Sequence, residues 1–262
     1  MNDGIPVGTR LGTEGKYIYA IIEADKPQEF SAPGIGDRGD KVYTVHQNGL
    51  AAVVSSSPVV KYRVSRDNTM AHQKVLEEVM KKFTLLPVRY CTIAEKEEDI
   101  KEKVLKAKYK EFKDLLGEMK DKTELGVRAI WTNMEQIFGE VIEENKDIGQ
   151  LKEKIAKESS LSKRREGMMK VGEMVKEALE KKKEYEEKEI MTVLKPLNVD
   201  LKTHKVYGDR NIFNAAFLVR KEKEGEFDEK INELEKKLGE RTKLEYFGPV
   251  PPCSFVEIVV TW

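Results

Sequence analysis

Residues 34–39 read Gly-Ile-Gly-Asp-Arg-Gly and match G-x-G-x-x-G, the pattern that binds the pyrophosphate of dinucleotides. That chemistry needs a strand before the glycines and a helix that opens on them, because the helix dipole and free amides then face the phosphates. Here Pro33 precedes the glycines and a strand-like run from Lys41 follows them. The context predicts a loop. A small-molecule or nucleotide-binding enzyme that uses this loop is kept as an alternative function.

The three histidines, His46, His72 and His204, fall in different predicted elements, and none has a second metal ligand at a recognised spacing. His72 shares a helical face with Val75 and Val79, which favours a partly buried structural histidine over a catalytic one. The histidines therefore predict no metal site.

The two cysteines, Cys91 and Cys253, have no neighbouring base in sequence, and the chain has no Gly-x-Ser-x-Gly elbow or Walker loop. Two distant cysteines do not make a disulfide framework, which favours a reducing cytoplasm. We expect no catalytic residue, no cofactor and no metal, and hence a protein that is not an enzyme.

The 262 residues carry 47 Lys+Arg and 47 Asp+Glu, so the formal net charge is zero. This balance argues against a protein that coats nucleic acid, which usually has a basic excess. No apolar run approaches the roughly 18–20 residues that span a bilayer, and the first residues lack the basic start and apolar stretch of a secretory signal. We expect a soluble intracellular protein with no nucleic-acid or membrane partner.

The first part of the chain alternates strand and helix patterns, with strands at 16–22, 42–46, 50–55 and 85–92 and a helix at 70–83. Asn48 and Gly49 form the favoured pair for a type I′ hairpin turn. Thr92 and Glu95 predict a capping box that opens a second helix. We predict a flexible N-terminus over 1–15 and an antiparallel-sheet α+β domain over 16–121.

A second set of elements follows, with strands at 125–131, 199–207, 212–220 and 241–247 and a helix at 227–238. Asn133 and Gln136 predict the start of another helix before the second of these strands. The order β-α-β-β-α-β is the ferredoxin-like pattern. We predict a ferredoxin-like C-terminal domain over 122–247, including a charged helical arm over 145–190.

The predicted arm has one regular apolar stripe, spaced alternately by three and four residues: Met168, Val171, Val175, Ala178, Lys182 and Tyr185. This spacing is typical of a helical hairpin or a short coiled-coil arm that breaks at 159–162. A single solvated helix lying along a sheet explains the pattern equally well. A coiled-coil scaffold built on the arm is a further alternative function.

The last segment, 248–262, is a proline-rich loop and an extended C-terminal tail whose prolines stiffen the backbone. Its apolar residues fall on one face of an extended chain. Such a tail either docks on a partner by strand addition or, as we favour, pairs with its own sheet. The candidate partner-binding residues are Phe247, Pro249, Pro251, Pro252, Phe255, Val256, Ile258, Val260 and Trp262.

Several separated blocks of this sequence resemble the gas vesicle protein F/L family, in the family's order and over about residues 16 to 260. The blocks are 16–21, 49–55, His72 with Val75 and Glu77, 86–92, 124–128 and 248–255. At four positions this chain departs from the family pattern. Leu125 and Val250 replace tryptophans, Cys253 replaces a tyrosine and Cys91 replaces a glycine.

The resemblance implies a minor structural component or assembly factor of gas vesicles, located at the vesicle and in the cytoplasm, and not an enzyme. Its implied partners are the major gas vesicle shell protein and other gas vesicle accessory proteins. It would bind the hydrophobic shell subunit, limit its aggregation and help to initiate the vesicle. The implied fold, an α+β domain followed by a ferredoxin-like domain with an extended tail, is similar to the one predicted from the residues.

Overall fold

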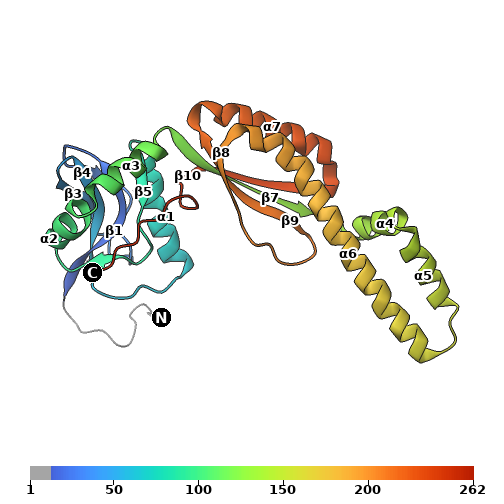
Figure 1. Ribbon diagram of the computed structural model, residues 1–262. Helices are drawn as coiled ribbons and strands as arrows, with labels where there is room; N and C mark the ends of the chain where they lie inside the picture. The colour runs from blue at the N-terminus through green and yellow to red at the C-terminus, as the bar shows by residue number, and fades with distance from the viewer. Residues whose placement is uncertain (1–12) are drawn as a thin grey trace. The chain divides into compact units, whose positions relative to one another are not determined.

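The computed structural model describes residues 13–262 (Figure 1). Two compact units make up the described chain: residues 13–124 together with Pro249–Trp262, and Leu125–Gly248. Most of the predicted flexible N-terminus lies outside the described residues, and the first strand already begins at Glu14. Two sheets and a set of long helices confirm the predicted α+β class.

The sheet of the first unit has the strand order β2-β3-β4-β1-β5, and β6 also pairs with β1. Its strands are β1 (Glu14–Glu23), β2 (Glu29–Phe30), β3 (Val42–Gln47), β4 (Leu50–Pro58), β5 (Leu85–Pro87) and β6 (Ile93–Ala94). β1 runs antiparallel to β4, β5 and β6. In the β3–β4 turn, Asn48 and Gly49 have φ values of 51° and 80°. The predicted hairpin is therefore confirmed, since a type I′ turn needs positive φ at both positions.

Helices cover both faces of this sheet. One face packs Tyr17 and Tyr19 of β1 against α1 (Arg66–Met80). Ile18 and Ile21, which alternate with them, are also fully buried. The α-helix α3 (Tyr109–Met119) and the π-helical segment η1 (Ile100–Lys106) also contact the strands. The sheet is thus a central layer, which explains why β1 reads as a continuous apolar run.

The chain after β5 corrects two details of the prediction. The strand expected over 85–92 ends at Pro87, and the chain turns a few residues later, where Cys91 adopts a left-handed φ of 66°. The predicted capping box is wrong, because the short helix α2 (Glu97–Asp99) begins after Lys96, which makes no side-chain cap. The Thr92 hydroxyl instead donates to the carbonyl of Arg89 at 2.7 Å, within the turn.

The sheet of the second unit has the order β10-β7-β9-β8. Its elements are β7 (Lys122–Trp131), α4 (Met134–Glu144), α5 (Lys146–Ala156), α6 (Leu161–Leu194), β8 (Asn198–Thr203), β9 (Asn211–Arg220), α7 (Glu224–Leu238) and β10 (Thr242–Val250). The predicted cap of α4 is confirmed, since the Asn133 side chain accepts from the amide of Gln136 at 3.1 Å. Helices α6 and α7 pack their apolar residues on this sheet (Figure 1). The strand and helix order matches the predicted ferredoxin-like pattern.

The arm combines the two predicted arrangements. Helices α5 and α6 form a hairpin whose connection, 157–160, lies close to the predicted break. The middle of the predicted stripe packs against the core, whereas its two ends, Met168 and Tyr185, are exposed. The C-terminal half of α6 lies along the sheet instead and buries Ile190 and Leu194 there.

Candidate functional site

The nine candidate partner-binding residues differ in exposure. The buried ones are Pro251, Pro252, Val256 and Ile258; the half-buried ones are Phe255 and Val260; the exposed ones are Phe247, Pro249 and Trp262. The alternation expected of an extended chain is present up to Val260, because Glu257 and Val259 face solvent between buried neighbours. These residues therefore have two roles: some anchor the segment, and others are available at its surface.

The anchoring contact is a short parallel pairing with the first unit's own sheet. Ile258 bridges to Val88, just beyond β5. The amide of Ile258 donates to the carbonyl of Pro87 at 2.8 Å, and the amide of Arg89 donates to the carbonyl of Ile258 at 2.9 Å. This is the arrangement that the sequence favoured, and it fills part of the exposed edge at β5.

A buried carboxylate fixes the segment a few residues earlier. Glu124 Oε2 accepts from the amide of Ser254 at 2.8 Å, and Oε1 accepts from the Ser254 hydroxyl at 2.7 Å. Glu124 is buried, so its charge needs these donors to offset lost hydration. This pair was not predicted from the sequence. Its only local signal is an acidic residue at the start of an apolar strand.

The ring of Phe247 packs against one particular residue of the second unit. A Cβ built on Gly126 would lie 1.9 Å from Cζ of Phe247, so the ring of Phe247 lies directly over this glycine on the neighbouring strand. The glycine of the block 124–128 is thus explained by close approach of an aromatic ring. Although 53% exposed, Phe247 belongs to the sheet and not to a free arm.

The last four residues of the C-terminal segment make fewer contacts than the residues before them. Beyond Ile258, residues 259–262 form no backbone hydrogen bond with the rest of the described chain. Val259 is 37% exposed and Trp262 is 55% exposed. An extended backbone with free donors and acceptors beside exposed apolar side chains is suited to strand addition.

The glycine loop 34–39 is closed on the first unit's own core. The amide of Gly34 donates to the carbonyl of Asp40, and the amide of Ile35 donates to the Tyr19 hydroxyl at 2.8 Å. Ile35 is fully buried, and strand β3 follows the loop where a dinucleotide cradle would have a helix. The geometry favours the predicted structural loop over a nucleotide site.

His72 lies in a cluster of aromatic rings beneath α1. Its Nδ1 is 3.0 Å from the Tyr17 hydroxyl, which also accepts from the amide of Cys91 at 2.9 Å. Burial lowers the pKa of His72 to about 4, so the ring is neutral at pH 7. The Tyr17 oxygen accepts from the Cys91 amide, which leaves the hydroxyl hydrogen of Tyr17 available to donate to Nδ1 of His72. The prediction of a buried structural histidine is confirmed.

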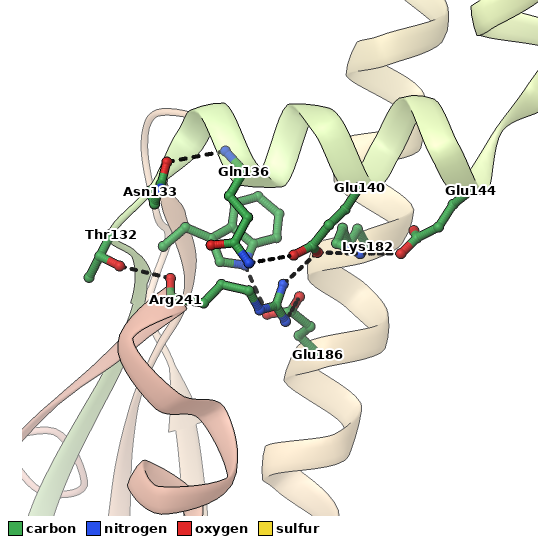
Figure 2. A network of polar contacts seen from close by, with 9 residues as sticks. Thr132, Asn133, Gln136, Glu140, Glu144, Lys182, Glu186 and Arg241 are labelled. Atoms are coloured by element: carbon green, nitrogen blue, oxygen red, sulfur yellow. Dashed lines mark hydrogen bonds and ion pairs between the residues drawn. The ribbon is translucent and has the colours of Figure 1, made fainter.

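A polar network lies at the base of the arm in the second unit (Figure 2). Glu186 of α6 is buried and accepts from Trp131 Nε1 at 2.8 Å and from Arg241 Nη2 at 2.7 Å. Arg241 also donates through Nη1 to Glu140 of α4 at 2.8 Å. A buried carboxylate is therefore satisfied from β7 and from the turn before β10.

The network continues outward along the two helices. Lys182 of α6 lies 3.1 Å from Glu140 and 2.6 Å from Glu144, both on α4. The Thr132 hydroxyl donates to the carbonyl of Arg241 at 3.0 Å (Figure 2). Charges thus alternate from the sheet end to the arm, and they fix α4 and α6 at their junction with the sheet. The spacing in the sequence placed Lys182 on an apolar stripe and did not indicate this role.

In residues 13–262, no three His, Cys, Asp or Glu side chains come together as a metal-binding group would. Among residues 13–262, no helix is both long enough and apolar enough to cross a bilayer. Cys91 and Cys253 are both free thiols.

These features define a two-unit α+β protein with a ferredoxin-like second unit, a helical arm and a C-terminal segment that returns to the first unit's sheet. The profile described as "Gas vesicle synthesis protein GvpL/GvpF" matches residues 15–257. The chain belongs to this family, which confirms the resemblance found in the sequence.

Curated relatives match over nearly their full lengths. Gas vesicle protein F of Nostoc sp. is 25% identical, and the match covers 94% of this chain and 99% of that protein. Gas vesicle protein F of Streptomyces sp. is 29% identical, with coverages of 92% and 99%. Gas vesicle protein F1 of Halobacterium salinarum is 26% identical, with coverage of 94% of both chains.

Two solved structures share the fold. The crystal structure of the gas vesicle protein GvpF from Anabaena sp. PCC7120 superposes with a TM-score of 0.82 at 24% identity, covering 94% of this chain and 99% of that one. GvpF from Microcystis aeruginosa gives a TM-score of 0.74 at 23% identity, with coverages of 92% and 98%. Membership of the family assigns the chain a role in gas vesicle formation.

Proposed function

We propose that this protein is a gas vesicle assembly factor and minor component that binds the hydrophobic shell protein and helps to initiate the vesicle. It acts as a binding protein and not as an enzyme, in the cytoplasm and at the growing vesicle, beside other vesicle accessory proteins. The family supplies the role in vesicle formation, while the binding step is the proposal.

The observation that carries the proposal is the exposed end of the C-terminal segment. Residues 259–262 continue the line of a strand already held at Ile258, and they leave their backbone groups unpaired within the described chain. Val259 and Trp262 present apolar surface beside these groups. A strand from an apolar shell subunit gains both hydrogen bonds and buried area by adding here.

The anchoring contacts support the same role. A wholly free apolar tail would expose Val256 and Ile258 as well and would itself be prone to aggregate. Because the Glu124–Ser254 contact and the Ile258 bridge hold the first half of the segment, only its end is presented. Among the nine candidate residues, we assign Trp262 and Val260 to partner contact, and the buried four to anchoring.

Aggregation of the shell protein tests this function. Purified shell protein is diluted from denaturant, and light scattering is followed with equimolar full-length protein, with a variant lacking residues 259–262, and with Trp262→Ala. The full chain is expected to suppress scattering, and both variants are expected to lose most of that effect. Val64→Ala, at an exposed apolar residue of the same unit, is the matched control and retains it. Equal suppression by all four proteins contradicts the proposal.

A further inference from the structure

Helix α6 has a second periodic face, spaced by three or four residues, which shares Met168 and Val175 with the stripe predicted from the sequence and otherwise differs from it. Its members are Leu161, Arg165, Met168, Gly172, Val175, Leu179, Lys183, Glu186 and Ile190. Such spacing keeps residues on one side of a helix over many turns and is the spacing by which helices pack against each other.

Burial along this face changes abruptly. From Leu179 to Ile190 it is covered by the second unit's own core, and Leu179 is only 4% exposed. Toward the start of the helix the same face is open, with Leu161 at 83% and Met168 at 63% exposure. The first half of α6 runs on beyond the sheet with α5 as its neighbour (Figure 1). The helix therefore presents a core-type face that the chain itself leaves uncovered.

The open half of this face is apolar and basic. Leu161 and Met168 are its exposed apolar residues, and the exposed Met169 lies at its edge. Exposed basic residues flank them at Arg164, Arg165 and Lys176. At 3.6 residues per turn, no carboxylate within 161–176 lies one turn from Arg164 or Arg165, whereas Glu173 lies one turn from both Met169 and Lys176.

Gly172 lies in the middle of the open face. Nothing lies within 4 Å of a Cβ built on this glycine, so it leaves a shallow gap between Met168 and Lys176. A gap of this kind allows the backbone of a partner helix to approach closely. The methionines beside it are flexible and adapt to the shape of a partner.

We propose that the open face of α6, over 161–176, is a docking site for an acidic amphipathic helix of another protein. The apolar side of that helix packs on Leu161, Met168 and Met169, and its carboxylates pair with Arg164 and Arg165. A second copy of this chain is a poor occupant, because two such faces would bring Arg164 and Arg165 of one copy close to the same cations of the other. This site is separate from residues 259–262 and does not rest on the proposed binding of the shell protein.

The test uses the full chain and a labelled synthetic helix of three heptads with Leu at a and d and Glu at e and g. Fluorescence anisotropy is expected to show binding that weakens as salt is added. The same peptide with Lys in place of Glu is expected not to bind. Met168→Ser with Met169→Ser removes the apolar contact and is expected to weaken binding about tenfold or more.

Two matched double variants distinguish binding to this face from binding to the overall positive charge of the helix. Arg164→Ala with Arg165→Ala is expected to weaken binding about fivefold. Lys163→Ala with Lys170→Ala removes the same charge from exposed residues on the opposite side of α6 and is expected to leave binding unchanged. Equal losses in both pairs, or no binding of the acidic peptide at millimolar concentration, overturn the proposal. Binding to phosphatidylserine vesicles without binding to the peptide also overturns it, in favour of a membrane surface.

Discussion

The carboxylate of Glu124 holds both the amide and the hydroxyl of Ser254, at 2.8 and 2.7 Å. The two residues are 130 positions apart in the chain and belong to two of the sequence blocks that resemble the gas vesicle family. The contact gives a physical reason for both blocks, because a buried carboxylate needs donors and the proline-rich segment supplies them. The contact also holds the C-terminal segment to the last residue of the stretch 13–124 in the first unit.

Glu124→Gln is expected to loosen this segment locally. A neutral amide cannot serve both donors as a carboxylate does, and a hydrogen bond to a charged group contributes about 1.5–3 kcal/mol. Hydrogen exchange of the Ile258 amide should therefore become at least tenfold faster. Glu257→Gln is the control, because it breaks only the exposed ion pair with Arg89 and should change exchange little. Equal acceleration in both variants would refute the anchoring role.

Gly126→Ala is expected to displace the Phe247 ring from its seat. The ring is half exposed and can swing into solvent, so the cost should be about 1 kcal/mol, the value of a cross-strand contact. Urea unfolding measures it. In a Phe247→Ala background, the same glycine substitution should cost much less, since no ring remains to be displaced. Additive effects in this double-mutant cycle would show that the two residues are not coupled.

His72 should make stability depend on pH in a defined window. Its pKa falls from 6.5 to about 4 on folding because the ring is buried. The unfolded chain therefore binds a proton between these values that the folded chain does not. The contribution is complete above pH 6.5 and is lost as pH falls toward 4, by up to about 3 kcal/mol.

His72→Gln keeps a polar group beside Tyr17 but cannot titrate, so its free energy of unfolding should fall less between pH 7 and 4 than that of the parent. His204→Gln, at an exposed histidine, should follow the parent curve. Chemical denaturation across this pH range measures both. Identical pH dependence in the parent and His72→Gln proteins would show that His72 is not the group that titrates.

Arg241→Met should leave Glu186 buried without its cation. Breaking a buried pair on one side costs about 3–5 kcal/mol, and Trp131 emission should change because its indole donates to the same carboxylate. The emission is read in a Trp262→Phe background, since the chain has two tryptophans. Lys237→Met, which removes a cation paired with the exposed Glu189, is the control and should cost less than about 1 kcal/mol.

The double change Arg241→Met with Glu186→Met extends the same test. Replacing both charges by apolar side chains removes the unpaired carboxylate, so most of the lost stability should return. A double variant no more stable than Arg241→Met would contradict the idea that the stranded charge causes the loss.

Local patterns predicted most elements of this fold. The Asn48-Gly49 turn depends only on which residues tolerate positive φ, and the burial of His72 follows from its spacing with Val75 and Val79. The error at Thr92 has the same origin, because a capping box is also a local signal. The left-handed turn at Cys91, a residue type that rarely adopts it, overrode that signal.

The site could not be predicted in the same way. The Glu124–Ser254 and Glu186–Arg241 contacts join residues far apart in sequence, and no spacing rule identifies such pairs. The apolar alternation of the tail indicated which side chains would be buried, but not that Val88 would pair with Ile258. The sequence also did not indicate that the face of α6 over 161–176 is uncovered, because this depends on how far the sheet extends along the helix.

The central claim is that the end of the C-terminal segment contacts the shell protein during vesicle assembly. A photo-crosslinking amino acid placed at Trp262, in cells that form gas vesicles, tests it directly. We expect a mass-identified adduct between position 262 and the major shell protein, and no such adduct when the same group replaces the exposed Lys82 of the same unit. Vesicle formation with no shell adduct at position 262, or with equal adducts at both positions, would contradict it.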